Sequence, residues 1–233
     1  MKVLLTNDDG IEAVGLHRLE RAALSLPDVT DVVVIAPRHH LSGISHQVTT
    51  DRPIQVDQVG ANRYAVHGTP ADCVRLAMLE LAKDVRWVFS GINDGGNLGV
   101  DIHMSGTVAA AREAAHFEVP AVAWSQYVRR PEETDWDAAE EMVRHAWTRL
   151  QRHSLARRSF WNVNFPHCPS DPSQIVLCSP DPDPLPVAFQ RGEGGYWYRG
   201  NYGERPRSAG RDVDVCFGGA IALSKLSAHP HGG

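Results

Sequence analysis

Two adjacent carboxylates, Asp8 and Asp9, follow a short apolar segment at residues 2–6, with only Asn7 between. The segment is typical of a buried first strand, and α/β proteins bind ligands at the carboxyl ends of such strands. Neighbouring like charges repel, so a folded chain tolerates the pair best when a cation is shared between them. The pair therefore indicates a hard-metal site. The alternative is a plain turn, because Asp9 and Gly10 form a common turn dipeptide.

Two further oxygen donors follow later apolar segments of the chain. Ser42 lies in the loop after residues 31–36, and Asn93 follows residues 85–90. If the three strands are neighbours, these side chains and the aspartates meet at one edge of the sheet. Carboxylate, hydroxyl and amide oxygens suit Mg²⁺, Mn²⁺ or Ca²⁺ rather than zinc or copper. Taken singly, Ser42 and Asn93 more often hydrogen-bond within their own loops.

A candidate phosphate site is formed by Ser105, Gly106 and Thr107, which begin a predicted helix. A helix N-terminus binds phosphate through its free N–H groups and its dipole. An ordinary capped helix is the alternative. The glycine-rich loop at residues 91–99 permits close approach of the backbone to a ligand, but a merely flexible loop has the same composition. It carries neither a dinucleotide fingerprint nor the lysine of a P-loop.

The histidines and the late aromatic residues are less specific. His39 and His40 stand near Ser42, but among twelve histidines a solvated loop position is the expected one. Residues 196–202 carry three tyrosines and a tryptophan among glycines. Such side chains can stack on a nucleobase, but they more often bury an arm against a neighbouring subunit.

The elements that must position these residues alternate along the chain. Apolar strands are predicted at residues 3–6, 31–36, 85–90 and 119–125, and helices at 14–26, 69–81, from Ser105 onward and at 136–153. Further β-prone segments are residues 47–56 and 63–66, and residues 162–166 fit a last core strand. Residues 192–203 favour an exposed hairpin arm. This alternation predicts an α/β fold, with a parallel sheet and helices on both faces.

Composition and charge argue against several classes of protein. The 233 residues carry a formal net charge of −5 without a basic stripe, which argues against binding to a nucleic-acid polymer. No run of about 18 apolar residues occurs, so we expect no membrane span. No apolar signal region precedes the first strand, and we expect a cytoplasmic protein. The four cysteines lack zinc-finger spacing and are predicted to be reduced, buried thiols.

Five motifs occur in order along the chain: Asn7-Asp8-Asp9-Gly10, Ser42-Gly43, Gly68-Thr69-Pro70-Ala71-Asp72-Cys73, Ser90-Gly91-Ile92-Asn93 with Asn97-Leu98-Gly99, and the run from Ser105 to Ala111. Together they resemble the SurE family of stationary-phase survival nucleotidases and acid phosphatases. The match is close over most of residues 1–125 and looser beyond, and residues 162–166 resemble the family's Asn-x-Asn-x-Pro segment.

The resemblance implies a metal-dependent phosphomonoesterase that acts on nucleoside monophosphates, as a 5′- or 3′-nucleotidase. It implies one divalent cation per subunit, Mg²⁺ or Mn²⁺, held by Asp8, Asp9, Ser42 and Asn93. The phosphate would be surrounded by Asn97, Ser105, Gly106 and Thr107. By the same resemblance Asp8, Asp9 and Asn97 are the catalytic candidates.

The family fold implies a Rossmann-like core, predicted here as residues 1–165, and a smaller β-rich region, residues 166–233, for oligomerisation. The aromatic segment and a C-terminal strand at residues 213–226 would then join subunits into a homodimer or homotetramer. Three places depart from the family pattern, and one of them, Ser224-Lys225-Leu226, lacks the family's threonine-proline pair. Leu41 cannot contact phosphate by charge, and Asp94 adds a carboxylate where a small residue is usual.

Two other classes of function share parts of this pattern. A non-catalytic nucleotide-binding regulatory module would need the same phosphate cradle, but it gains little from carboxylates beside a phosphate. A dinucleotide-dependent oxidoreductase on a similar core is disfavoured by the missing fingerprint. No cysteine or serine stands in a nucleophile setting, so direct attack by water is the preferred mechanism.

Overall fold

The computed structural model describes residues 1–229. Its strands are β1 (Lys2–Thr6), β2 (Asp31–Pro37), β3 (Val56–Gly60), β4 (Arg63–Val66), β5 (Trp87–Asp94), β6 (Ala121–Gln126), β7 (Ser159–Phe165), β8 (Ile175–Leu177), β9 (Phe189–Gly192), β10 (Gly195–Tyr198) and β11 (Ile221–Ser227). Its α-helices are α1 (Val14–Leu24), α2 (Pro70–Leu76), α3 (Gly106–His116), α4 (Trp136–Leu150) and α5 (Asp212–Phe217). Short turns of π-helix (Ala77–Leu81) and 3₁₀-helix (Gly99–His103 and Tyr202–Glu204) complete the elements.

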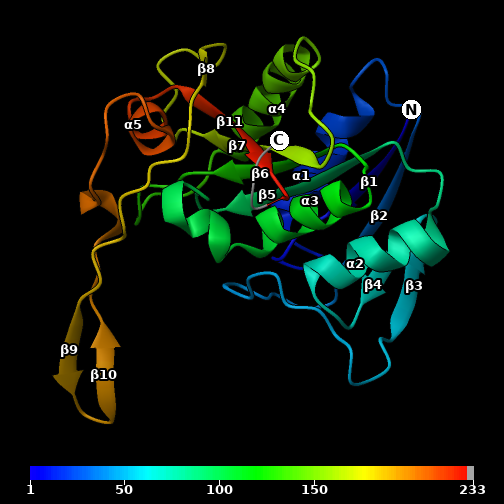
Figure 1. Ribbon diagram of the computed structural model, residues 1–233, viewed down its shortest axis with the longest axis horizontal. Helices are drawn as coiled ribbons and strands as arrows, with labels where there is room; N and C mark the ends of the chain where they lie inside the picture. The colour runs from blue at the N-terminus through cyan, green and yellow to red at the C-terminus, as the bar shows by residue number, and fades with distance from the viewer. Residues whose placement is uncertain (230–233) are drawn as a thin grey trace.

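The main sheet runs in the order β3-β4-β2-β1-β5-β6-β7-β11-β8 (Figure 1). The six strands from β4 to β7 are parallel, β3 and β11 are antiparallel to their neighbours, and β8 is parallel to β11. The strand order reverses between β1 and β5, and such a switch point is where open α/β sheets bind ligands. The prediction of a mostly parallel α/β fold is confirmed.

Helices cover both faces of this sheet. Helices α1 and α4 pack together on one face, and α2 and α3 pack together on the other. Alternate residues of β1 serve the two faces: Val3 and Leu5 belong to the core under α1 and α4, and Leu4 belongs to the core under α2 and α3. Burial on both sides explains why the central strands are continuous apolar runs.

Local capping fixes where two of the helices begin. Thr69 accepts a hydrogen bond from the backbone of Asp72, whose carboxylate accepts one from the backbone of Thr69, and Pro70 fills the first turn. Ser105 likewise caps α3 by accepting from the backbone of Val108 at 3.0 Å. The predicted helix at residues 69–81 is α-helical only to Leu76 and continues as a π-helical turn.

Three sequence-based expectations are corrected by the structure. Residues 47–55 contain no strand, and β3 begins only at Val56. Residues 213–226 are not one strand, because α5 occupies Asp212–Phe217 before β11 begins at Ile221. Strand β7 is also not the last strand of the core. Strands β11 and β8 extend the sheet beyond it, because the chain returns from the arm with enough apolar side chains to cover that edge.

A hairpin arm is present as β9 and β10, at residues 189–198 rather than 192–203, and it projects away from the sheet (Figure 1). The division of the chain at residue 165 stays a prediction. The cysteines are all free; Cys73 and Cys216 are buried, but Cys168 is exposed, so the prediction of buried thiols is wrong for that residue. Within residues 1–229, no helix combines the length and the apolar character needed to cross a bilayer.

Candidate active site

The strand order brings the predicted oxygen donors to one edge of the sheet. Strands β2, β1 and β5 are parallel neighbours, so their carboxyl ends lie side by side. Asp8 and Asp9 follow β1, Ser42 is in the loop after β2, and Asn93 is near the end of β5. The sequence left open whether these three strands are neighbours, and the structure shows that they are.

The segment after β1 is also a turn, as the alternative interpretation proposed. The Asn7 side chain closes it, donating to the Gly10 carbonyl at 2.9 Å and accepting from the Gly10 N–H at 3.2 Å. Gly10 has a φ of +104°, a conformation that disfavours any residue with a Cβ. The turn and the carboxylate site are thus one feature, since the turn presents Asp8 and Asp9 at the sheet edge.

Asp8 is a buried carboxyl held by the first turn of α3. Only 5% of the residue is exposed, and the Thr107 hydroxyl donates a hydrogen bond to its Oδ1. A Cβ on Gly106 would lie 2.7 Å from the Asp8 Cβ, so α3 can approach this closely only with glycine there. Burial raises the pKa of Asp8 to about 6, although the hydrogen bonds from Thr107 oppose the shift.

Asp9 is more open and has different partners. Its Oδ1 lies 3.1 Å from His40 Nδ1, and its Oδ2 accepts from the backbone N–H of Asp94 at 3.4 Å. The pKa of Asp9 is raised, mainly by burial and also by the nearby Asp94 carboxylate, while His40 works in the opposite direction. Both members of the pair thus resist ionisation in the absence of a bound cation.

His40 is the residue that the sequence interpretation missed. It was expected to be a solvated loop histidine, and its side chain is indeed 60% exposed. It nevertheless connects two predicted ligands, because its Nε2 lies 2.8 Å from the Ser42 hydroxyl oxygen while its Nδ1 faces Asp9. The only available signal was its position two residues before Ser42.

Asn93 and Asp94 form the other side of the site. The Asn93 amide nitrogen donates to the Gly95 carbonyl at 2.7 Å, which leaves the amide oxygen as its metal-binding atom. The Asp94 carboxylate, the departure from the family pattern, accepts from Arg130 at 2.8 Å and from Thr134 at 2.6 Å. Its added negative charge is therefore paired with a cation from the loop before α4.

Asn97 is fixed by buried polar residues on the neighbouring strands. Its backbone N–H donates to Asn164 Oδ1 at 2.7 Å, and its carbonyl accepts from Asn162 at 2.9 Å. Its side-chain nitrogen donates to the Ser125 hydroxyl at 2.8 Å. The asparagines of β7 thus hold the glycine-rich loop in one conformation. This excludes the flexible-loop interpretation for the part of the loop around Asn97.

The donor chemistry fits a hard divalent cation. Asp8 and Asp9 supply two carboxylates whose pKa values are raised, mainly because burial removes them from water, and a cation would favour their charged forms. Asn93 adds an amide oxygen, and the Ser42 hydroxyl lies on the same rim through its contact with His40. These are oxygen ligands of the kind that Mg²⁺ and Mn²⁺ accept.

Two cavities lie near the site, and the first of them is lined by a member of the carboxylate pair. One of about 340 Å³ is lined by Asp9, His40, Asp94, Val14 and Trp136. The other, of about 380 Å³, has a mixed wall that includes Arg38, Leu41, Ile44, Thr49, Arg52 and His67. Leu41 thus supplies apolar wall to the second cavity, while its backbone N–H donates to the Asp8 carbonyl at 2.8 Å.

Comparison with solved structures supports the fold. The chain superposes on the crystal structure of the SurE protein from Aquifex aeolicus with a TM-score of 0.85 and 27% sequence identity. The match covers 99% of this chain and 94% of the other.

Sequence comparison gives the same result. A Synechocystis sp. protein is 46% identical over 228 residues, which cover 97% of this chain and 99% of that protein. The protein named 5′-nucleotidase SurE from Paramagnetospirillum magneticum is 36% identical over 97% of this chain and 89% of its own length. The model of the family described as survival protein SurE matches residues 3–181. The resemblance drawn from the motifs is confirmed, and the chain belongs to the SurE family.

Proposed function

We propose that this protein is a divalent-metal-dependent phosphomonoesterase that hydrolyses nucleoside monophosphates to nucleoside and inorganic phosphate. The observation that carries the proposal is the buried carboxyl of Asp8, adjacent to Asp9 and held by the first turn of α3 at the switch point of the sheet. The names of relatives such as the P. magneticum 5′-nucleotidase support the substrate class and favour the 5′ ester. Cleavage of 3′ esters is the finer question that a substrate panel answers.

The proposed cation ligands are Asp8, Asp9, Ser42 and Asn93. When bound there, Mg²⁺ or Mn²⁺ supplies positive charge to a phosphoryl oxygen and lowers the pKa of water. Asp8 and Asp9 bring the negative charge that retains the ion. The Asn7 turn and the Thr107 hydroxyl keep Asp8 in place, so little reorganisation is needed when substrate arrives.

A carboxylate of the Asp8–Asp9 pair is the proposed proton acceptor. Water attacks phosphorus, the bond from phosphorus to the nucleoside oxygen breaks, and the nucleoside oxygen takes up a proton. Whichever carboxylate of the pair is not fully engaged by the cation would accept a proton from the attacking water and pass it on to the leaving oxygen.

Asn97, Ser105, Gly106 and Thr107 are the proposed phosphate-binding residues. All four are buried, and the Ser105 hydroxyl is used by the helix cap while the Thr107 hydroxyl is used by Asp8. For Ser105, Gly106 and Thr107 the contribution to phosphate binding would therefore come from the N–H groups and dipole of the first turn of α3, which also act on Asp8. Asn97 would contribute the side-chain amide hydrogen that it does not donate to Ser125.

We place the nucleoside in the cavity of about 380 Å³. This cavity shares the loop of Leu41 and Ile44 with the carboxylate site, and a Cβ on Gly106 would lie 3.0 Å from the Ile44 side chain. Apolar walls with a few polar and basic groups suit a base and a ribose. The aromatic arm at β9–β10 is the competing location for base stacking.

Phosphate release from the 5′ and 3′ monophosphates of each nucleoside, and from p-nitrophenyl phosphate, tests the proposal. Each substrate is assayed with EDTA, with Mg²⁺ and with Mn²⁺. We expect release that EDTA abolishes and added metal restores. Tight nucleotide binding without any release would instead favour the regulatory module, and turnover unaffected by EDTA would contradict the metal-dependent mechanism.

We also propose a homodimer or homotetramer in which the β9–β10 arm contacts a second subunit. The arm exposes Phe189, Tyr196, Trp197 and Tyr198 to solvent, each by more than half of its surface. Exposed apolar patches of this kind mark interaction surfaces. The proposed location in the cytoplasm remains the expectation from sequence.

A further inference from the structure

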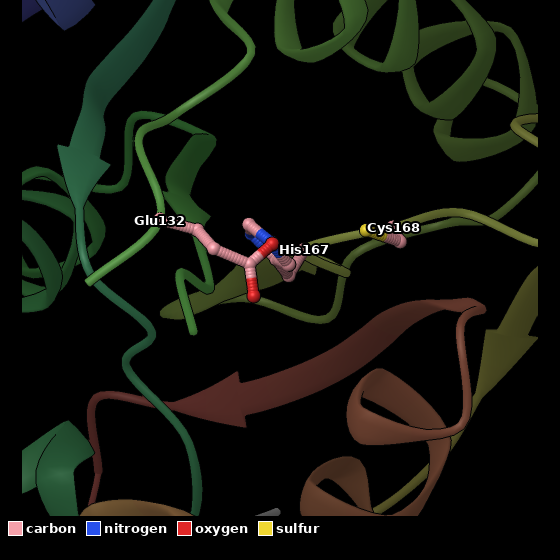
Figure 2. Close-up of side chains that lie close together, drawn as sticks. All are labelled: Glu132, His167 and Cys168. Carbon is pink, nitrogen blue, oxygen red and sulfur yellow. The ribbon is translucent and has the colours of Figure 1, made fainter. Parts of the chain in front are cut away.

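A group of three potential metal ligands lies at the carboxyl end of β7, outside the donor set of the proposed phosphatase site. His167 and Cys168 follow β7 by two and three residues, and Glu132 belongs to the loop between β6 and α4 (Figure 2). One ligand atom from each side chain lies within 4.8 Å of the other two. Among residues 1–229 this is the one such group of three His, Cys, Asp or Glu side chains.

The donor chemistry of this cluster differs from that of the Asp8–Asp9 site. An imidazole nitrogen, a carboxylate oxygen and a thiolate sulfur form a mixed set that Mg²⁺ does not favour and that Zn²⁺ accepts readily. We propose that Glu132, His167 and Cys168 form a Zn²⁺ site with three protein ligands and a fourth position open to water or to another small ligand.

The distances permit this site with small side-chain movements. Tetrahedral zinc with ordinary bond lengths separates its ligand atoms by about 3.3–3.8 Å. His167 Nε2 and Glu132 Oε2 are now 2.7 Å apart in a hydrogen bond, and an ion would enter as they separate by less than about 1 Å. The Glu132 side chain is 54% exposed and Cys168 is exposed, so both can adjust.

The backbone around the cluster is anchored. The carbonyl of Pro166, next to His167, accepts a hydrogen bond at 2.8 Å from the buried Gln126 side chain. The His167 side chain is itself only 9% exposed. Glu132 is tied to its own loop by a 3.0 Å bond from its N–H to the Arg129 carbonyl. One ligand is thus fixed and two are adjustable, a combination that allows an ion to enter.

The cluster is connected to the phosphatase site through the Glu132 loop. The same loop carries Arg130 and Thr134, which both bind the Asp94 carboxylate. The backbone of Asp94 donates to Asp9. An ion that joins Glu132 to the end of β7 would therefore hold this loop against the edge of the phosphatase site. This consequence rests on the proposed function, but the binding of Zn²⁺ to the cluster does not.

Cobalt binding tests the proposal directly. The full-length, metal-stripped protein is kept reduced, saturated with Mg²⁺ and titrated with Co²⁺, while the thiolate-to-cobalt charge-transfer absorption is recorded. We expect one Co²⁺ per chain to give this charge-transfer band, and we expect Zn²⁺ to displace that Co²⁺. Cys168→Ser should abolish the band, and His167→Gln should weaken binding by at least about tenfold. Cys178→Ser, which changes a half-buried thiol elsewhere, is the matched control and should leave the band unchanged.

An absent band in the wild type, or an equal band in Cys168→Ser, would overturn the zinc site. The Asp9→Asn variant separates this outcome from the proposed phosphatase function. It should retain the cobalt band and the Zn²⁺ stoichiometry although phosphate release is lost. Loss of the band in Asp9→Asn would show that the thiolate binds no metal unless the phosphatase site is intact, and would equally overturn a separate zinc site.

Discussion

The edge of the sheet at Asp8 and the arm formed by β9 and β10 break the usual rule of burial in opposite directions. Asp8 is a carboxyl with only 5% of its surface exposed, whereas Tyr196 is 72% exposed and Trp197 58% exposed. Globular proteins usually expose charge and bury large aromatic side chains. The burial of Asp8 and the exposure of the arm are therefore both energetically unfavourable in the single chain.

Different partners would remove these two unfavourable features. Burial has raised the pKa of Asp8 to about 6, so a cation at the site would relieve the unfavourable charge. The arm instead leaves apolar surface in water, and only another apolar surface relieves that. The difference supports the two proposals made above, a small ion at the sheet edge and a macromolecular partner at the arm.

Asp8→Asn is the strongest test of the first half of this comparison. We expect phosphate release to fall by about three orders of magnitude, because several kcal/mol of charge stabilisation depend on the retained cation. Steady-state assays with saturating Mg²⁺ or Mn²⁺ measure the loss, and far-UV circular dichroism checks the fold. Asp94→Asn, at the same edge but outside the proposed ligand set, should lose far less. Near wild-type turnover of Asp8→Asn in Mn²⁺ would show that the cation assignment is wrong.

The same substitution should stabilise the metal-free protein. The folded state raises the pKa of Asp8 from 3.8 to about 6, so the folded chain binds more protons than the unfolded chain between these values. Stability from this group therefore falls as pH rises through that window, by about 3 kcal/mol when the fall is complete. In EDTA at pH 7, Asp8→Asn should raise the free energy of unfolding by up to about that amount. If urea unfolding shows no gain in the free energy of unfolding, or a gain that does not depend on pH, then the charge of Asp8 is not unfavourably buried.

Thr107→Val should have a smaller effect, because it removes one hydrogen bond to Asp8 and leaves the carboxylate. Bonds to charged groups contribute roughly 1.5–3 kcal/mol. Because Asp8 is a proposed ligand of the cation that would bind phosphate, we expect the inhibition constant of inorganic phosphate to rise by about tenfold or more. In EDTA the pKa of Asp8 should rise further, since the Thr107 hydroxyl lowers it, and the pH dependence of urea unfolding should extend to higher pH. Thr107→Ser, which keeps the hydroxyl, is the control. An unchanged inhibition constant and an unchanged pH dependence of unfolding would remove Thr107 from the site.

Arg52→Ala asks whether the cavity near Leu41 or the aromatic arm holds the nucleoside. We expect the KM for nucleoside monophosphates to rise by about tenfold, the effect of about 1.4 kcal/mol, with little change for p-nitrophenyl phosphate, which has no nucleoside. Arg157→Ala, which changes an exposed arginine paired with Glu118, is the control. Equal changes for both substrates would argue against a nucleoside in this cavity.

The double substitution Tyr196→Ser with Trp197→Ser should have the smallest effect on the single chain. Both side chains are exposed, so we expect the stability of the monomer to change by no more than about 0.5 kcal/mol. Sedimentation velocity should instead show a lower mass than for the wild type. An unchanged mass together with a raised KM for nucleotides would assign the arm to substrate binding and reverse the comparison.

Much of the architecture followed from local patterns. The continuous apolar runs of β1, β2, β5 and β6 and the start of α2 are encoded within a few residues, by burial on both faces and by capping. Helix α5 was missed because residues 212–217 form only six residues of helix, too short for an amphipathic period to stand out. Strand β11 pairs with β7 across about sixty residues, and pairing at such a separation leaves no local signal.

The sequence identified the residues of the candidate site by their chemical types, but it did not identify the groups that contact them. His40 joins Asp9 to Ser42, and Thr107 donates to Asp8 across 99 residues of sequence. The Glu132–His167–Cys168 cluster was likewise hidden, because its members come from two loops and Cys168 was expected to be buried.

The sequence by itself determined which chemical groups this protein has and the strand ends at which they stand, because strand endings and capping residues are local properties of the chain. The tertiary structure decided their electrostatics. Adjacency of β1, β2 and β5 gathers the donors, and close packing of α3 at Gly106 buries Asp8 and raises its pKa. Desolvation depends on everything packed around a group, and no stretch of sequence contains that information.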